Sequence, residues 1–300
     1  MTPNAAALRI PSPLVDVAWL RSHLGDPSLV LFDASWHMPA TGRDGAAEFL
    51  DAHIPGARHF DFDRRIRDPN ADLPHMLPSP ELFEREVRAL GVRRDSVIVC
   101  YDSLGIFASP RVWWMFRAMG HDAVAVLDGG LPAWRDAAGA VVSGPPAPAV
   151  SGDFVARIQP ARIADLDSVH VALSDPQVRV LDARSAGRFT GRDPEPRPGL
   201  RGGHMPGAVN LPFGELLDGV RFRNPDDRAA RLATVAGNAR TLICTCGSGV
   251  SACVIALAAE IAGMRDVAVY DGSWAEWGGR TDTPVEAHNQ NAGGSVRSGV

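Results

Sequence analysis

Residues 241–252 read Thr-Leu-Ile-Cys-Thr-Cys-Gly-Ser-Gly-Val-Ser-Ala, and the order of residue types predicts the local fold. The apolar start favours a short buried strand, and the alanine-rich run that follows favours a helix. Cys246 then ends the strand just before the helix N-terminus, where unpaired amides and the helix dipole favour a negative charge. Gly247 and Gly249 let the backbone curl around one point. This pattern is typical of a reactive thiolate, and the alternative is a buried cysteine in an ordinary turn.

Length and composition indicate a globular protein of two ordinary domains, since the chain has 300 residues and a net charge of -5. No basic stretch suggests nucleic acid or an anionic membrane as a partner, and no apolar run approaches the length of a membrane span. The four cysteines are too few for a disulfide scaffold, so we expect a cytoplasmic protein. We expect no metal and no cofactor, because nothing in the composition indicates either.

The chain repeats itself in three short segments that keep their order. The segment LFDA at 31–34 recurs as VLDA at 180–183, and HIPGA at 53–57 recurs as HMPGA at 204–208. VLDG at 126–129 recurs as VYDG at 269–272. Ordered matches of this kind indicate a tandem duplication, and the repeat is much longer than that of a solenoid.

Both halves predict the same series of elements. We expect a helix, a strand ending in aspartate, a central strand, a second helix ending at glycine and a last strand. The expected helices that open the halves cover 16–24 and 162–173, and the expected strands cover 29–33, 96–101, 124–127, 178–182, 241–245 and 267–270. Continuous apolar strands alternating with helices predict an α/β fold with a mostly parallel sheet covered by helices on both faces, in each of two tandem domains.

The Pro-rich stretch around residues 144–148 predicts the boundary between the two domains. The predicted organisation is an N-terminal domain over 1–140, a linker over 141–158, a C-terminal domain over 159–285 and a flexible tail over 286–300. The repeat aligns Cys246 with Asp102, so the first half carries a carboxylate where the second carries a thiol. Two bulky residues, Ile106 and Phe107, follow in the first loop, and we expect that loop to be catalytically silent.

Several ordered motifs resemble those of the two-domain sulfurtransferases built from tandem rhodanese domains, over roughly residues 13–285. The matching segments are DASW at 33–36, HIPGA at 53–57, HMLP at 75–78, PRVWWM at 110–115, GRF at 187–189, PEPR at 194–197, CGSGVSA at 246–252 and DGSW at 271–274. The resemblance implies that Cys246 attacks the donor sulfur and carries it as a persulfide. The acceptor would be a thiol, such as that of thioredoxin, or cyanide.

The resemblance also implies roles for other residues. Arg188 and Arg197 would bind a substrate carboxylate and keto oxygen, since a planar guanidinium matches a carboxylate with two hydrogen bonds. Ser248, His75 and Asp63 would form a triad that handles protons, although Asp61 lies in the same loop as Asp63. The other loop residues expected to line the substrate are Gly247, Gly249, Val250 and Ser251.

The loop after Cys246 distinguishes two donors within this family. Members that prefer thiosulfate tend to carry basic residues directly after the cysteine, whereas Gly247 and Ser248 follow it here. Thiosulfate is a dianion that gains from cations beside the loop, whereas mercaptopyruvate carries its carboxylate away from its sulfur. The resemblance therefore favours 3-mercaptopyruvate as the donor, and thiosulfate:cyanide sulfur transfer is the alternative.

Three other classes fit the sequence less well. A phosphatase of the Cys-x5-Arg type requires arginine where this chain has Ala252. A metal site built on Cys244, Cys246 and Cys253 has no histidine at a zinc-binding spacing. A sulfur-binding module without catalysis would lack either the complete loop or the two substrate arginines, and this chain has both.

Overall fold

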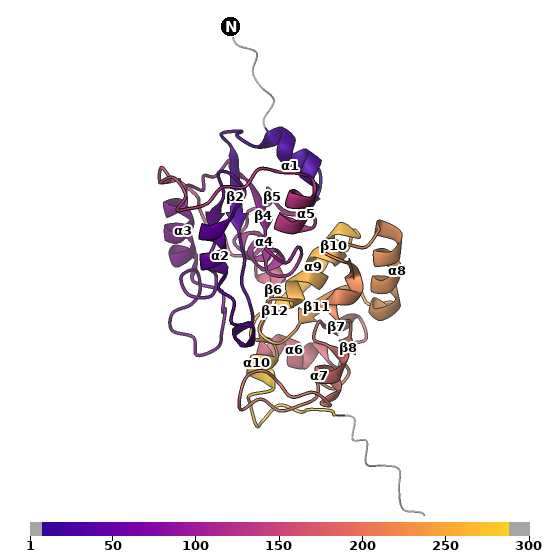
Figure 1. The fold of residues 1–300 in the computed structure, drawn as a ribbon. Coiled ribbons are helices and arrows are strands. Elements are labelled where there is room, and N and C mark those ends of the chain that lie inside the picture. The colour runs from indigo at the N-terminus through magenta and orange to yellow at the C-terminus, as the bar shows by residue number, and fades with distance from the viewer. Residues whose placement is uncertain (1–7, 288–300) are drawn as a thin grey trace, which may run out of the picture.

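The protein is described by a computed structural model that covers residues 8–287, and it contains two five-stranded parallel sheets (Figure 1). Both sheets have the same spatial order, β1-β5-β4-β2-β3 and β6-β12-β11-β7-β8, which confirms that the fold is repeated. The first sheet is formed by β1 (Leu14–Val15), β2 (Leu29–Asp33), β3 (Arg58–His59), β4 (Val97–Tyr101) and β5 (Val124–Leu127). The second is formed by β6 (Ile163–Ala164), β7 (Val178–Asp182), β8 (Val209–Asn210), β11 (Thr241–Thr245) and β12 (Asp266–Tyr270).

Helices cover both faces of each sheet, as the apolar strands predict. In β4, Ile98 and Cys100 pack on one face of the sheet, whereas Val99 and Tyr101 pack on the other. Side chains alternate in this way along a strand, so a strand that is apolar throughout is buried from both sides. The helices are α1 (Val17–His23), α2 (Gly45–Asp51), α3 (Pro80–Ala89), α4 (Ser109–Ala118), α5 (Gly130–Asp136), α6 (Leu166–Ala172), α7 (Ala186–Thr190), α8 (Pro225–Ala236), α9 (Ala252–Ile261) and α10 (Ser273–Trp277). An antiparallel hairpin of β9 (Leu217–Asp218) and β10 (Arg221–Phe222) belongs to the second domain.

The expected start of the second domain was partly wrong. A helix was expected over 162–173, but residues 163 and 164 form the edge strand β6, which pairs with β12. The helix α6 begins only at Leu166, because Asp165 caps it by accepting the backbone N–H of Ser168 at 2.9 Å. The expected helix ends are confirmed, since Gly120 and Gly263 follow α4 and α9 with φ angles of 82° and 89°.

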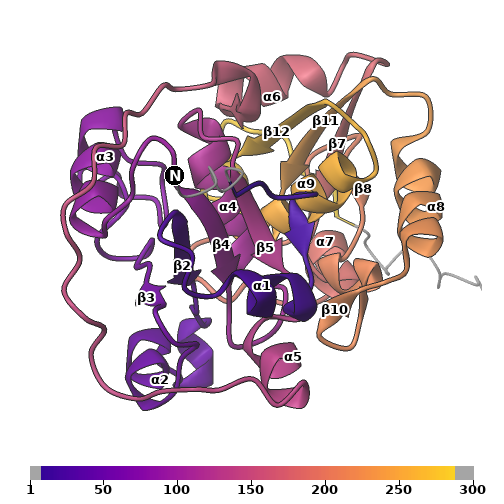
Figure 2. The same cartoon turned by 90° about the horizontal axis from the view of Figure 1, so that it is seen from above.

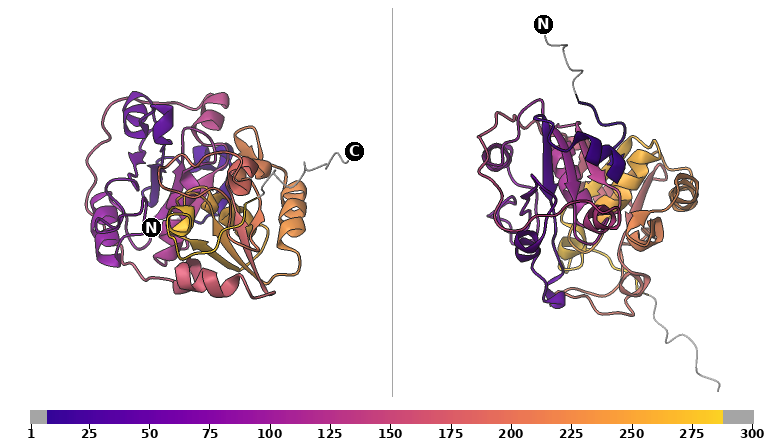
Figure 3. Two further views of the ribbon diagram at one scale, coloured as in Figure 1. Left: turned by 90° about the horizontal axis from the view of Figure 1, so that it is seen from below. Right: turned by 45° about the horizontal axis from the view of Figure 1, so that its top comes forward.

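The two domains pack through α4 and α9, which lie side by side between the two sheets (Figures 1 and 2). Nearly every residue of both helices is buried, and one apolar cluster continues from the first domain into the second. Further views show the two domains in broad contact (Figure 3). The carboxyl ends of β4 and β11 precede α4 and α9, so the loops that follow these two strands both lie beside the domain interface.

The linker is extended, but it lies along the first domain. It passes α2 and α3 on its way from α5 to α6 (Figure 2). Val142 pairs with His53, and the Gly152 N–H donates to the carbonyl of Arg88 at 2.8 Å. Phe154 is 2 % exposed and packs on Phe83 with ring centroids 5.7 Å apart. The linker boundaries over 141–158 remain a prediction, and most of the expected tail over 286–300 lies outside the described residues.

Candidate functional site

Cys246 is followed by a loop whose backbone N–H groups have no partner among the described residues. Cys246 is 2 % exposed and lies between the end of β11 and the start of α9. Within residues 8–287, no group accepts a hydrogen bond from the backbone N–H groups of residues 247–251. Five unpaired amides at the N-terminus of a helix stabilise a negative charge placed at their centre. The loop is therefore suited to a thiolate or a persulfide on Cys246.

Residues that follow β12 hold this loop in place. The hydroxyl of Ser273 accepts the Cys246 N–H at 3.2 Å. The N–H of Trp274 donates to the Cys246 carbonyl at 3.0 Å, and the N–H of Ala275 donates to the Gly247 carbonyl at 2.8 Å. Gly249 has a φ of +76°, and a Cβ there would lie 2.9 Å from the Asp271 carbonyl oxygen. The loop therefore depends on glycine at this position.

The matching loop of the first domain already contains an anion. The buried carboxylate of Asp102 occupies the place that the repeat gives to Cys246. One of its oxygens, Oδ2, accepts hydrogen bonds from the N–H groups of Phe107 at 3.0 Å, Ala108 at 3.0 Å and Ser109 at 2.8 Å. A second anion bound there would face the Asp102 charge. The loop of the first domain thus directs its backbone N–H groups at a carboxylate of its own.

Arg188 lies directly beside residues 246–251, which we call the catalytic loop because of the role predicted for Cys246. A Cβ on Gly247 would be 2.8 Å from the Arg188 Nη2, so glycine is what allows the guanidinium to approach. Arg188 belongs to α7, and its Nη2 and Nε donate to Glu195 at 2.6 and 3.3 Å. The Glu195 side chain is 1 % exposed, whereas that of Arg188 is 23 % exposed. Glu195 thus fixes the orientation of the Arg188 guanidinium, and the remaining N–H groups are available to a ligand.

Arg197, the second predicted substrate arginine, belongs to the same group of charged residues. Burial lowers the pKa of Arg197, the negative charge of Cys246 raises it, and the positive charge of Arg188 lowers it. The charge of Arg197 therefore lies within electrostatic range of Cys246 and Arg188. Its Nη2 also lies 3.4 Å from the Nε2 of His75. The two predicted substrate arginines and the cysteine are therefore brought together.

His75 reaches this cluster from the first domain. Its Nδ1 lies 3.0 Å from an Asp63 oxygen, and its ring packs edge-on against Trp36 at 4.8 Å. Burial lowers the pKa of His75, although the Asp63 carboxylate opposes this effect. The same contact lowers the pKa of Asp63. With Nδ1 facing Asp63, the Nε2 of His75 lies on the side of Arg197, whose guanidinium can donate to it.

The remaining predicted residues line or support the loop. Ser248 is 5 % exposed, but no hydrogen bond joins its hydroxyl to His75 within residues 8–287. The Asp63–His75 pair is therefore present, whereas the Ser248–His75 contact of the predicted triad is not. Val250 is buried in the core shared by the two domains, and Ser251 precedes the first residue of α9 without capping it through its side chain.

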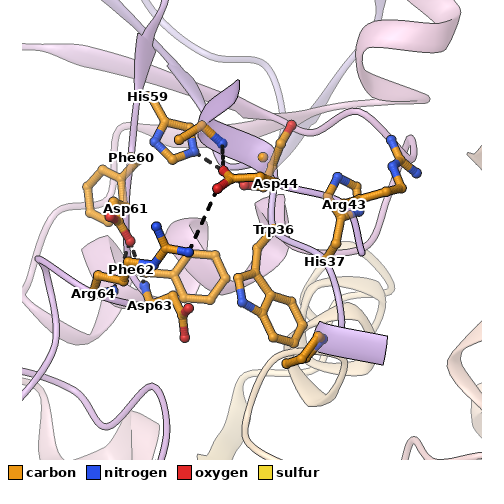
Figure 4. A pocket seen from close by; sticks show the side chains of 14 residues that line it. Trp36, His37, Arg43, Asp44, His59, Phe60, Asp61, Phe62, Asp63 and Arg64 are labelled. Carbon is orange, nitrogen blue, oxygen red and sulfur yellow. Dashed lines mark hydrogen bonds and ion pairs between the residues drawn. The ribbon is translucent and has the colours of Figure 1, made fainter. Parts of the chain in front are cut away.

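A cavity of about 160 Å³ lies beside Asp63 (Figure 4). Trp36 and Asp63 line it together with Asp44, His59 and Arg64. Neither Cys246 nor Arg188 is among the residues that line this cavity, so it is separate from the catalytic loop. It leaves the Asp63 side chain 35 % exposed while His75 is 1 % exposed.

Comparison with known proteins identifies the repeated fold. The family model for the rhodanese-like domain matches residues 16–137 and again residues 165–280. The chain belongs to the rhodanese family. Three similar proteins are a 3-mercaptopyruvate sulfurtransferase of Homo sapiens, a thiosulfate sulfurtransferase of Bos taurus and a structure from Escherichia coli whose name refers to the "Rhodanese" fold and 3-mercaptopyruvate sulfotransferases.

These similarities extend over most of each chain. The human protein is 42% identical over 88% of this chain and 91% of its own length. The bovine protein is 41% identical over 88% of this chain and 91% of its own length. The Escherichia coli structure has a TM-score of 0.79 at 35% identity and covers 88% of this chain and 99% of that chain.

One part of this rhodanese-family site was not predicted. Arg184 contacts Asp182 at 2.6 Å and Glu195 at 2.7 Å, and its guanidinium lies 4.2 Å from the ring centroid of Trp274. Because Glu195 also binds Arg188, these charges form a continuous chain up to the catalytic loop. The signal in the sequence was Glu195 itself, an acid between two prolines in the segment PEPR, from which only Arg197 was selected.

Proposed function

We propose that the protein is a sulfurtransferase that takes sulfur from 3-mercaptopyruvate onto Cys246 and passes it to a thiol or to cyanide. The observation that carries this proposal is the loop of free amides around Cys246, with Arg188 and Arg197 beside it. The Cys246 thiolate attacks the donor sulfur, and the carbon–sulfur bond breaks. The electron pair of that bond leaves with the carbon as the enolate of pyruvate, which takes up a proton. The acceptor then removes the outer sulfur and returns the thiolate.

The two arginines bind the organic end of the donor. A guanidinium donates two parallel hydrogen bonds to a carboxylate, and Arg188 is held for this by Glu195. Arg197, which lies beside His75, stabilises the keto oxygen as it becomes an enolate. Neither arginine follows Cys246 directly in sequence, which fits a donor whose carboxylate is remote from its sulfur.

The Asp63–His75 pair handles the proton of the first half-reaction. Asp63 holds the Nδ1 side of the imidazole, and burial favours its neutral form. Ser248 supplies a hydroxyl from the catalytic loop and carries the proton between His75 and the reacting atoms. This step requires a hydrogen bond between Ser248 and His75, and we propose that it forms when the donor binds.

The choice of donor rests on the loop and not on overall similarity. The relatives named for mercaptopyruvate and for thiosulfate have nearly equal identity, 42% and 41%. Gly247 and Ser248 place no cation directly after Cys246, and thiosulfate, a dianion, would gain most from such a cation. Paired kinetics with the two donors test this. We expect a higher kcat/KM with mercaptopyruvate, and a higher value with thiosulfate would replace the proposal with the thiosulfate:cyanide alternative.

The acceptor and location follow from the same chemistry. A protein thiol such as that of thioredoxin, or cyanide, can attack the outer sulfur of a persulfide. All four cysteines are free thiols, which suits a reducing compartment such as the cytoplasm. Within residues 8–287, no helix combines the length and apolarity needed to cross a bilayer.

A further inference from the structure

A buried ion pair joins the two domains next to the site. Arg111 belongs to α4 of the first domain, is 0 % exposed and donates from Nη1 to an oxygen of Asp271, which follows β12 of the second domain, at 2.6 Å. Burial lowers the pKa of Arg111, but Asp271 and the nearby thiols more than offset this effect, so the pKa is raised. The guanidinium also lies 4.5 Å from the ring centroid of Trp114.

The hydrogen bonds of this pair reach two functional segments. Arg111 donates from Nη2 to the carbonyl oxygen of His75 and from Nη1 to that of Gly249 at 3.3 Å. The second oxygen of Asp271 accepts the N–H of Leu77 at 2.7 Å. One ion pair therefore holds the backbone of residues 75–77 and also contacts the Gly249 carbonyl of the catalytic loop.

The backbone of His75 requires such support. His75 has a φ of 62°, in the left-handed region that residues other than glycine rarely adopt. A residue in this region remains there only when its surroundings hold it, and the contacts at the His75 carbonyl and the Leu77 N–H are of that kind.

We propose that Arg111 and Asp271 are positioning residues that hold His75 against the catalytic loop across the domain interface. The proposal rests on the proposed function, in which His75 handles a proton of the mercaptopyruvate half-reaction. The pair itself does not touch the reacting atoms. It fixes where the Nε2 of His75 lies relative to Arg197 and Ser248.

The repeat supplies a matched control for this pair. Asp128 is the counterpart of Asp271, and it also crosses the interface, because it accepts the N–H of Phe222 at 3.0 Å. It follows β5 near the silent loop, since the Leu131 N–H donates to the Asp102 carbonyl at 3.0 Å. Asp128→Asn therefore weakens an equivalent cross-domain hydrogen bond without touching the His75 segment.

The variant that tests the pair removes both charges. Removing one partner leaves a buried unpaired charge and can unfold a protein, whereas replacing both partners with apolar residues is often neutral. We therefore compare Arg111→Met, Asp271→Leu with Asp128→Asn and the wild type, using full-length protein and thermal melting to check folding. Asp271→Asn, which keeps the size of the side chain, is the second variant.

Single-turnover persulfide formation with the two donors gives the first readout. We expect both Asp271 variants to lose about tenfold or more of the rate with mercaptopyruvate, the lower range of acid–base effects. The rate with thiosulfate should change less than about threefold, because sulfite leaves without a proton, and Asp128→Asn should keep the wild-type ratio. Equal losses with the two donors, or the same donor ratio as in Asp128→Asn, would overturn the proposal.

Amide hydrogen exchange gives a readout that does not depend on the donor. We expect a peptide that contains residues 75–77 to exchange faster in the Asp271 variants than in Asp128→Asn. Asp271→Leu removes the acceptor of the Leu77 N–H, and Asp271→Asn leaves one acceptor oxygen for two donors. Unchanged exchange would refute the positioning role even in an active enzyme. If the wild type formed no persulfide from mercaptopyruvate, the proposed function would fail, whereas the exchange result would still decide whether the pair holds His75.

Discussion

Replacing Arg188 with lysine tests whether the guanidinium fork, and not charge alone, binds the donor. Arg188 donates from Nε and Nη2 to Glu195 at 3.3 and 2.6 Å. Its Nη1 group and the second Nη2 proton can still donate to a substrate carboxylate. A lysine has a single nitrogen, which can pair with the buried Glu195 or with the substrate but cannot hold both in this geometry.

The structure sets the size of the expected effect. Losing one charge-assisted hydrogen bond to the carboxylate costs about 1.5–3 kcal/mol. At about 1.4 kcal/mol for each factor of ten, kcat/KM for mercaptopyruvate should fall roughly 10- to 150-fold in Arg188→Lys. The rate at which cyanide removes sulfur from the persulfide should fall much less, because cyanide has no carboxylate.

Pyruvate release at fixed cyanide concentration measures this change, with Arg192→Lys as the control. Arg192 follows α7 by two residues, is exposed and contacts only the Thr190 hydroxyl among the described residues, at 3.2 Å. We expect wild-type kinetics in Arg192→Lys. The reasoning is refuted if Arg188→Lys keeps the wild-type kcat/KM, or if Arg192→Lys loses as much.

Two further predictions concern His75. His75→Ala should lower persulfide formation from mercaptopyruvate about a hundredfold and spare that from thiosulfate, whose sulfite needs no proton; equal losses would remove His75 from the mechanism. The second concerns stability. Burial holds the pKa of His75 in the folded protein below its ordinary value of 6.5. Just below pH 6.5, the imidazole is therefore protonated in the unfolded chain but not in the folded protein. Stability is therefore retained above pH 6.5 and lost as pH falls, and His75→Gln should show a smaller drop in melting temperature from about pH 7.5 to about pH 5.5. An identical pH dependence in both proteins would contradict the burial of a neutral imidazole.

The strands of the fold could be predicted because they are buried from both sides. Each of the six central strands is mostly apolar, so its position was predicted to within one residue. The edge strands β1, β3, β6 and β8 were missed, because each has only two residues and forms through pairing with a strand from elsewhere in the chain. A run so short carries no periodicity of its own, and Ile163–Ala164 was therefore assigned to the following helix.

Site residues that belong to a recognisable motif could be predicted from the sequence. A residue whose role depends on a partner far along the chain could not. The loop of Cys246 and the contact of Asp63 with His75 lie where the family resemblance places them. The role of Arg111 depends on Asp271, which lies far along the chain in the other domain. Arg111, one of two cations in an otherwise mostly apolar helix, was the available signal, but the sequence does not show which acid faces it.

Mass spectrometry of the protein after exposure to 3-mercaptopyruvate tests the central claim most directly. We expect one added sulfur, about 32 Da, on Cys246, because its loop provides free amides for a sulfur anion. Burial raises the pKa of Cys100, Cys244 and Cys253 well above the ordinary value, so these thiols should remain unmodified. Cys246→Ser should abolish the added mass. Sulfur found on Cys100, Cys244 or Cys253, or added equally to Cys246→Ser, would contradict the assignment of Cys246 as the sulfur carrier.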